Sequence, residues 1–274
     1  MDQKSAIKEY WEKEVCGSRY GVSRDKAEWF KEIERSRYRL EPYIPSFADF
    51  EAYKGKRVLE IGLGAGTDFV NWQRNQARAV GVDISEESVK ITRQRLVLEG
   101  ADPGFCNVCV ADAENLPFKE NAFEMVYAWG SLHHTPDIKK ALKEIRRVLK
   151  PQGKMKAMIY HIPSWTGWML WLRFCLFRLR PWDSVSKAIF EHLESPGTKA
   201  FTLTQAKEML ARANFSDIET QLKLGPGDKL LIKPGKRYQA LFYKFIWLIY
   251  PRWLVSLLGN NFGLNLFIKA RKGL

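Results

Sequence analysis

Residues 58–68 constrain the fold more than any other part of the 274-residue chain. They begin as an apolar run and continue with glycine at every second position, at Gly62, Gly64 and Gly66. A buried strand that leads into a glycine-rich turn and then a helix is typical of the ligand-binding edge of an α/β sheet. Glycine is needed in such a turn because the backbone bends sharply and approaches the ligand closely.

Three acidic residues stand at the ends of predicted strands. Glu60 lies directly before the glycines, Asp83 falls near the end of the apolar run 79–84, and Asp112 follows the run 108–111. A carboxylate at the end of the second strand of such a sheet can accept hydrogen bonds from both hydroxyls of a ribose. A carboxylate at the tip of the third strand can accept from an adenine amine. The set predicts a ligand that carries adenosine.

The spacing of the glycines argues against a dinucleotide. The dinucleotide pattern requires glycine where this chain has Thr67, and it places a pyrophosphate at the start of a helix. Glu60 would add negative charge next to such a phosphate. A carboxylate at this position suits a positively charged ligand, such as one with the amino group and sulfonium of S-adenosylmethionine.

With these residues the chain resembles class I S-adenosylmethionine-dependent methyltransferases, and most of all the small-molecule branch that contains the ubiquinone and menaquinone methyltransferases. Besides the glycines and acids, the resemblance rests on Leu116-Pro117-Phe118, Leu132-His133-His134 and Arg147-Val148-Leu149-Lys150-Pro151, and it covers about residues 53–160. Gln152 replaces the middle residue of the usual Pro-Gly-Gly turn. The resemblance implies that S-adenosyl-L-methionine is bound by Glu60, Gly62, Gly64, Gly66, Asp83, Ile84, Asp112, Ala113, Trp129 and Gly130.

The alternation of apolar and amphipathic segments predicts an α/β fold, and the resemblance specifies a Rossmann-like, seven-stranded methyltransferase sheet. Strands are expected at about 57–62, 79–84, 107–112, 123–129, 154–160, 217–224 and 264–271. Helices are expected at about 66–76, 85–99 and 137–150, and a further helix, cued by Thr204, runs to about residue 214. Residues 225–262 are expected to interrupt the final hairpin of the sheet.

Three regions are expected along the chain. Residues 1–52 form an N-terminal helical lid with helices at 4–15 and 25–40, residues 53–160 form the cofactor-binding core, and residues 161–274 supply substrate-side insertions, apolar-basic helices and the last strands. Tyr10, Tyr20 and Tyr38 are candidate lid contacts, although aromatic residues at helical spacing also serve simple packing.

The net charge of +13 lies entirely in residues 150–274, which hold 20 Lys and Arg against 7 Asp and Glu. Such asymmetry favours a polyanionic partner, either nucleic acid or an anionic membrane surface. Residues 162–182 and 240–258 are rich in tryptophan and aliphatic residues. A membrane span needs about 20 consecutive apolar residues, and cations interrupt both segments before that length is reached. These segments suit helices at the lipid headgroup level, or walls of an internal pocket, or a dimer interface.

Cysteine and the N-terminal sequence add two expectations. The four cysteines show no disulfide framework, and Cys106 and Cys109 form a single CxxC pair that we interpret as ordinary strand residues, so no metal site is expected. No secretory signal opens the sequence, so the expected location is the cytoplasm, with the option of peripheral attachment to the cytoplasmic membrane face.

Methyl transfer needs a base only where the acceptor must lose a proton. His133 and His134 follow the fourth strand and His161 follows the fifth, so these three are the catalytic candidates, and His192 lies in a later polar loop. A helix cap is the alternative role for one of the pair, and a mechanism by proximity alone stays open.

The favoured function is methyl transfer to a small lipophilic or membrane-presented acceptor, such as a quinone, an isoprenoid or a lipid. A soluble natural product or sugar is the alternative acceptor. RNA is disfavoured because residues 129–132 lack the Asn/Asp-Pro-Pro-aromatic motif of nucleobase amino methyltransferases. A cofactor-binding protein without catalysis is the least favoured alternative, and the sequence leaves the oligomeric state open.

Overall fold

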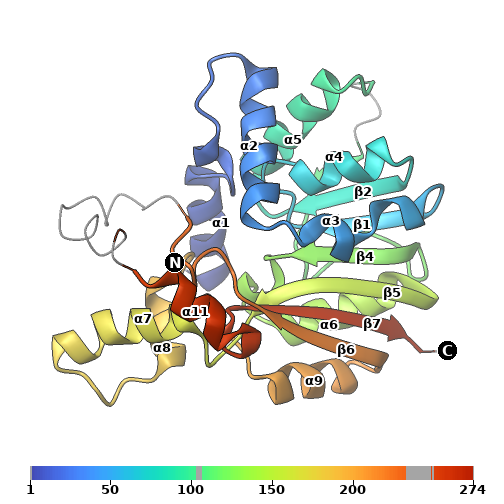
Figure 1. Cartoon of the computed structure of the whole chain (residues 1–274). Coiled ribbons are helices and arrows are strands. Elements are labelled where there is room, and N and C mark those ends of the chain that lie inside the picture. Colours follow the sequence, from blue (N-terminus) through green and yellow to red (C-terminus); the bar gives the residue numbers. More distant parts are fainter. Residues whose placement is uncertain (1, 103–106, 233–247, 249, 274) are drawn as a thin grey trace.

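A seven-stranded sheet forms the centre of the molecule (Figure 1). The computed structural model describes residues 2–102, 107–232, 248 and 250–273. The strands are β1 (Arg57–Ile61), β2 (Arg78–Asp83), β3 (Val108–Val110), β4 (Phe123–Trp129), β5 (Leu149–Tyr160), β6 (Phe215–Lys223) and β7 (Asn265–Lys272). Their order in the sheet is β3-β2-β1-β4-β5-β7-β6, and β7 runs antiparallel to both of its neighbours. The predicted methyltransferase sheet is confirmed.

Helices cover both faces of this sheet. Successive residues of each strand point to opposite sides, so each strand contributes apolar side chains to both layers of helices. Leu59 and Ile61 of β1 join the apolar cluster that contains α6 (Ile138–Val148) and α9 (Leu203–Arg212). Val58, the residue before Leu59, joins the cluster on the other face. That second cluster includes residues of α3 (Ile44–Ala48), η2 (Phe50–Tyr53), α4 (Thr67–Arg74) and α5 (Glu86–Leu98).

Capping side chains fix where the helices begin. Ser85 accepts a hydrogen bond from the backbone of Ser88 and starts α5, as its position before the helix predicts. The predicted start of α9 at Thr204 is wrong, because Thr202 and Gln205 form a reciprocal capping box two residues earlier. The third strand is also shorter than predicted, since Asp112 leaves the sheet and forms an isolated bridge with Asn115.

The N-terminal segment forms α1 (Gln3–Lys13), η1 (Ser18–Tyr20) and α2 (Lys26–Leu40) before the sheet begins. Helix α1 lies against α5 at the carboxyl edge of the parallel strands. Lys8 of α1 pairs with Glu86 at 2.7 Å, and the carboxylate of Glu12 accepts hydrogen bonds from the backbone of Glu86 and Glu87. The side chain of one helix therefore caps the N-terminus of the other.

The region after β5 departs from a plain sheet-and-helix pattern. It forms α7 (Trp165–Phe174), η5 (Leu176–Arg178) and α8 (Val185–His192), which project from the sheet as a helical arm (Figure 1). Between β6 and β7 the structure also contains α11 (Arg252–Leu258) and η7 (Asn260–Phe262), so the final hairpin is interrupted as predicted. Among the residues that the structure describes, no helix is both long enough and apolar enough to cross a membrane.

Some sequence predictions fall on residues outside the described ranges. These are Cys106 of the CxxC pair, and Lys244 and Trp247 of the second apolar-basic segment. The arm α7–η5–α8 contains the first apolar-basic segment and lies within the described residues.

Candidate active site

The glycine turn connects β1 to α4 and has the backbone geometry that its sequence predicts. Gly62, Gly64 and Gly66 all have positive φ angles, of 88°, 51° and 69°. A Cβ at Gly62 would lie 2.5 Å from Cβ of Ser131, whose hydroxyl donates to the carbonyl of Ile61 at 2.7 Å. The turn after β4 therefore packs directly on the glycine turn, and no side chain fits between them.

Asp83 ends β2 beside this turn. One carboxylate oxygen accepts from the backbone N–H of Gly64 at 3.1 Å and the other from that of Ser85 at 2.9 Å. A carboxylate has about four acceptor positions, so acceptor capacity stays available to a ligand. Burial raises the pKa of Asp83 to about 6 although these backbone hydrogen bonds oppose the rise. The residue is well suited to accept from paired ribose hydroxyls.

Glu60 is buried at the start of the same turn. Its carboxylate accepts from the indole N–H of Trp72 at 2.8 Å. Burial, followed by the charge of Asp68, raises the pKa of Glu60 well above its ordinary value. A cationic ligand group near Glu60 would relieve this unfavourable concentration of negative charge.

Asp68, in the first turn of α4, is a second buried acid next to Glu60. The guanidinium of Arg37 binds both of its oxygens, at 3.0 and 2.6 Å, and the hydroxyls of Tyr38 and Tyr127 each donate to it at 3.1 Å. Charge-assisted hydrogen bonds of this kind are stronger than neutral ones. Helix α2 is therefore fixed to the cofactor edge by a buried ion pair.

Asp112 lies at the tip of β3, where Lys4 from α1 reaches it. The ammonium of Lys4 lies 2.6 Å from Asp112 and 2.8 Å from Glu114. Glu114 also accepts from the backbone N–H of Asp137 at 2.8 Å, so its carboxylate is held on two sides. The first helix is thereby connected to the residue that the sequence assigns to adenine.

These groups surround one cavity of about 320 Å³, in the size range of small-molecule sites. Of the predicted cofactor residues, its lining contains Glu60, Gly62, Gly64, Asp83, Ile84, Asp112, Ala113, Trp129 and Gly130. Gly66 is the exception, because it starts α4 and packs against Thr92. The cavity continues past the cofactor edge to Trp11, Cys16, Tyr20, His134, Tyr160 and Glu194.

His134 is the one of the three candidate histidines that lines this cavity. Its Nδ1 lies 2.9 Å from the hydroxyl of Ser195 and 3.1 Å from that of Thr198, while its Nε2 lies 3.3 Å from Glu194. The ring of Trp11 packs edge-on against the imidazole at a centroid distance of 5.2 Å. Contacts from α1 and from the loop after α8 hold His134 at the far end of the cavity.

The other two histidine candidates occupy different environments. His133 is 0% exposed and stacks on Tyr160 at a centroid distance of 3.8 Å, outside the cavity lining. His161 is also buried and outside the lining, and its Nδ1 is 3.1 Å from the carbonyl of Gly263. Burial lowers the pKa of both imidazoles, most strongly that of His133. Of the lid candidates, Tyr20 lines the cavity.

Sequence reasoning missed several groups that the structure brings to the site. Lys4, Arg37, Asp68 and Glu194 lie on separate parts of the chain, up to about two hundred positions apart, and none stands in a recognisable motif. The acidic residue in the first turn of α4 was the one available signal, since a negative charge is favourable at a helix N-terminus.

The sheet order, the glycine turn and the acidic strand ends together define a class I methyltransferase domain. Residues 59–156 match the family model described as a methyltransferase domain. The chain therefore carries a class I S-adenosylmethionine-dependent methyltransferase domain, and S-adenosyl-L-methionine is its cofactor.

The relatives of this chain differ in length and in the acceptor that their names give. The chain is 34% identical over 104 residues to the sterol 4-C-methyltransferase of Caenorhabditis elegans, covering 38% of this chain and 31% of that protein. It is 28% identical over 181 residues to the ubiquinone/menaquinone C-methyltransferase of Blochmanniella pennsylvanica, covering 62% and 69%. The chain spans about a third of the length of several curated relatives that it matches.

One solved structure shares its fold with nearly the whole of this chain. Geranyl diphosphate C-methyltransferase from Streptomyces coelicolor aligns with a TM-score of 0.62, 16% sequence identity, and coverage of 99% of this chain and 98% of that one. At this identity the likeness concerns the fold alone.

Proposed function

We propose that the protein transfers a methyl group from S-adenosylmethionine to a small lipophilic acceptor that a membrane surface presents. The carrying observation is the single cavity that begins at Asp83 and Glu60 and continues to the aromatic chamber around His134. Its lining beyond the cofactor edge includes Trp11 and Tyr160. A cofactor end and an aromatic acceptor end in one cavity suit transfer between two bound molecules.

The residues present fit the cofactor. Asp83 has acceptor capacity for the ribose, and the buried carboxylate of Glu60 favours a ligand with positive charge. When bound, the sulfonium supplies an activated methyl group, whose bond to sulfur breaks as the acceptor attacks. The chain's own task is to hold the acceptor in line, exclude water and, through His134 and Glu194, orient its polar group.

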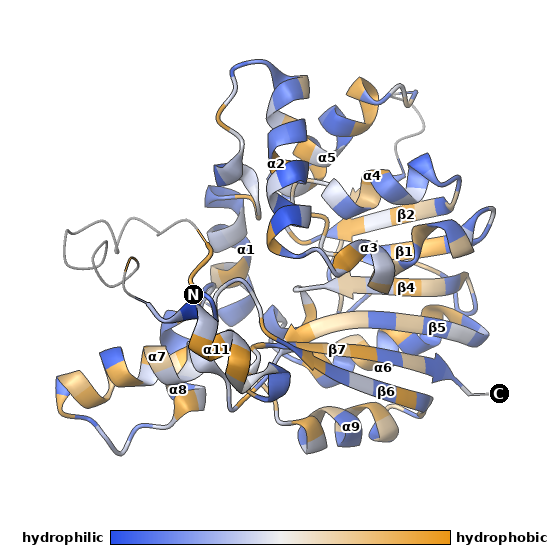
Figure 2. Cartoon of the chain, viewed as in Figure 1, coloured by the Kyte–Doolittle hydropathy of each residue, from blue (hydrophilic) through white to orange (hydrophobic). Residues whose placement is uncertain are grey.

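The apolar-basic arm supports a membrane-presented acceptor. Phe177, Leu179 and Trp182 on the chain between α7 and α8 are 74%, 82% and 77% exposed. Arg178 and Arg180 alternate with them along the sequence. Figure 2 shows hydrophobic segments along the projecting α7–α8 arm. Exposed aromatic residues interleaved with cations suit the headgroup layer of an anionic membrane, at about 1 kcal/mol per cation.

The relatives are consistent with this acceptor class, since their names refer to a sterol and to a quinone. A soluble acceptor would need none of the exposed aromatic residues of the arm. The two possibilities therefore predict different behaviour with lipid vesicles.

Two measurements on the full chain test the proposal. In flotation with vesicles containing phosphatidylserine, the protein should float, and the variant Phe177→Glu/Trp182→Glu should stay at the bottom. Lys207→Glu/Lys229→Glu, which changes the charge more strongly without touching the arm, is the matched control. With S-adenosylmethionine labelled in the methyl group, label should enter the organic phase when a membrane lipid extract is added. Label entering only water-soluble products would contradict the lipophilic acceptor.

A further inference from the structure

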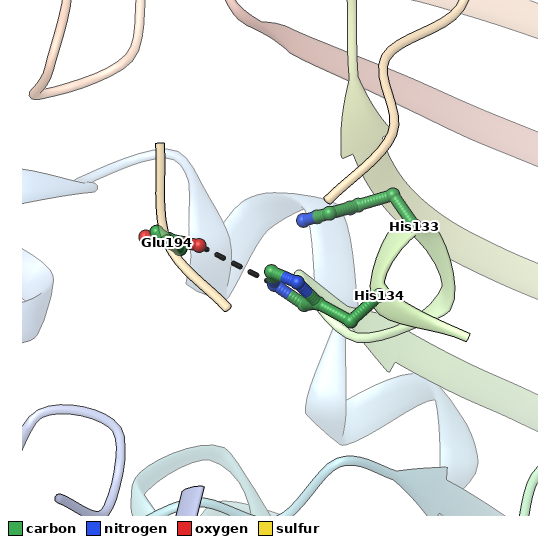
Figure 3. A group of neighbouring side chains, drawn as sticks. All are labelled: His133, His134 and Glu194. Atoms are coloured by element: carbon green, nitrogen blue, oxygen red, sulfur yellow. Dashed lines mark ion pairs between the residues drawn. The ribbon is translucent and has the colours of Figure 1, made fainter. Parts of the chain in front are cut away.

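Three side chains form a close group beside the acceptor end of the cavity, and two of them, His134 and Glu194, line it. His133 and His134 leave one short segment, η4 (Leu132–His134), and Glu194 faces them from the loop after α8 (Figure 3). Each offers one ligand atom, and the three atoms lie within 4.8 Å of one another. The two imidazoles are buried and the carboxylate is partly buried.

Two hydroxyls surround Nδ1 of His134 and bear on which of its nitrogens carries a proton. The hydroxyl of Thr198 donates to the carbonyl of Ser195 at 2.7 Å, so towards Nδ1 of His134, at 3.1 Å, it can only accept. The hydroxyl of Ser195, 2.9 Å from Nδ1, can serve either tautomer. The tautomer with the hydrogen on Nδ1 satisfies Thr198 and leaves a lone pair on Nε2, which has no hydrogen-bond partner among the described residues. That lone pair lies 3.3 Å from a carboxylate oxygen of Glu194. In this tautomer a lone pair and a carboxylate oxygen lie close together, an arrangement that a bound cation would stabilise.

His133 adds a second, independent observation. It is completely buried, and neither of its ring nitrogens has a hydrogen-bond partner among the residues that the structure describes. Buried polar atoms are satisfied in the great majority of cases, so an imidazole with two unpartnered nitrogens points to a missing ligand. The stacked ring of Tyr160, 3.8 Å away between centroids, fixes the orientation of this imidazole.

We propose that His133, His134 and Glu194 bind one divalent transition-metal ion, with Zn²⁺ as the best match. Metal bonds to histidine and carboxylate are about 2.1 Å long, which places neighbouring ligand atoms about 3.0–3.4 Å apart. The observed 3.3 Å between His134 and Glu194 already fits this spacing. Two imidazoles and one carboxylate suit zinc or iron(II) rather than magnesium or calcium, which prefer all-oxygen sites.

The surroundings of the three ligands have the features of an outer coordination shell. Ser195 and Thr198 hold the other nitrogen of His134, and the hydroxyl of Tyr160 donates to Glu194 at 2.9 Å. Such partners fix the tautomer of a metal-bound histidine and the orientation of a metal-bound carboxylate. His134, Tyr160 and Glu194 also line the cavity, so an ion held here faces the acceptor.

The ion deepens the proposed function, on which this part of the inference rests. It would bind the oxygen of a phenolic or enolic acceptor and lower the pKa of that hydroxyl. The proton leaves to water, an electron pair of the oxygen or of its conjugated carbon forms the new bond to the methyl carbon, and the electron pair of the carbon–sulfur bond goes to sulfur. The acceptor class is therefore a phenol, hydroquinone or enolisable carbonyl compound.

Metal binding is tested on the full chain after chelator treatment and dialysis. Titration with Zn²⁺ in a calorimeter should give one site per chain with micromolar or tighter affinity. Glu194→Gln and His134→Asn should each weaken binding at least tenfold. The control Glu191→Gln/His192→Asn changes a second histidine–glutamate pair, 3.6 Å apart on α8, and should bind like the unmodified chain. Cys16→Ser, which removes the cavity thiol, should also leave the affinity unchanged.

Cobalt gives a readout that needs no variant. Co²⁺ added to the metal-free chain should develop the visible absorption of a four- or five-coordinate ion, and Zn²⁺ should remove it. Absence of one-site Zn²⁺ binding below 100 µM, equal affinity in Glu194→Gln, or a cobalt spectrum like that of the ion in water would each overturn the metal site.

The two proposals can fail separately. If Zn²⁺ does not bind but lipid extract still accepts label, and a chelator has no effect, the metal site is wrong and the proposed function stands. If Zn²⁺ binds through these residues but no lipid fraction accepts label, the metal site stands and the proposed acceptor is wrong. Binding of S-adenosylhomocysteine to each variant verifies that its fold is intact.

Discussion

Replacing Asp83 by Asn should weaken cofactor binding by a predictable amount. In the native site both oxygens of Asp83 accept backbone hydrogen bonds, from Gly64 and Ser85, and the carboxylate retains acceptor capacity for the ribose. Asparagine keeps one oxygen and turns an NH₂ group towards one of these N–H donors. Hydrogen bonds to a charged group contribute about 1.5–3 kcal/mol, so affinity should fall about 10- to 150-fold.

The pH dependence gives the same prediction a second form. Burial raises the pKa of Asp83 to about 6, and the ribose hydroxyls favour the ionised carboxylate. Affinity should therefore be constant above about pH 7 and fall as the pH drops through 6, by up to tenfold for each further unit. In Asp83→Asn this dependence should disappear, because the amide does not titrate.

Calorimetric titration with S-adenosylhomocysteine from pH 5 to pH 8 measures both effects. The product retains the ribose and lacks the reactive methyl group. Thermal unfolding of Asp83→Asn shows whether the variant is folded. Equal affinity of the two proteins at pH 7.5, or native affinity that does not change between pH 5 and pH 7.5, would refute the assignment of Asp83 to the ribose.

Three further changes test other parts of the site. Gly62→Ala should lose about 1–3 kcal/mol of unfolding free energy in urea, because the new methyl group meets the turn after β4 at a positive φ; Gly100→Ala, with φ of 90° and open space around it, should lose less. Trp72→Phe removes the indole N–H that donates to the buried carboxylate of Glu60, and it should also lower the unfolding free energy by about 1–3 kcal/mol. An unchanged urea midpoint would contradict this role of Trp72. Lys4→Met should release bound S-adenosylhomocysteine about fivefold faster in stopped flow, the ratio expected from about 1 kcal/mol of partly exposed ion pairing, whereas Lys13→Met, whose partner lies within α1, should not.

The cofactor half of the site could be predicted because its signals are local. Glu60 and Asp83 each stand at the end of an apolar run, and the parallel strands bring these ends to one edge of the sheet. The same reasoning located Asp112 at the tip of β3. What it could not predict is the ammonium of Lys4 on that carboxylate, since the pair is separated by 108 positions.

The acceptor half depends on contacts between distant segments, and sequence periodicity says little about these. His133 and His134 are adjacent, yet one stacks inside the protein and the other faces the cavity. Their difference arises from the single-turn helix η4 and from the loop that carries Glu194, 60 positions later. The sequence predicted no metal site, since its one CxxC pair has no second pair, and the three residues of the proposed site are not grouped in a motif.

The contacts of α1 have a consequence for the order of events in turnover. With Lys4 on Asp112 and Glu114, and with Glu12 at the start of α5, the first helix lies against the predicted adenine end of the cavity. We expect a spent cofactor molecule to leave after these charged contacts separate. Their strength falls as ionic strength rises, so the turnover rate should increase with moderate salt if departure of the product, rather than chemistry, sets the pace.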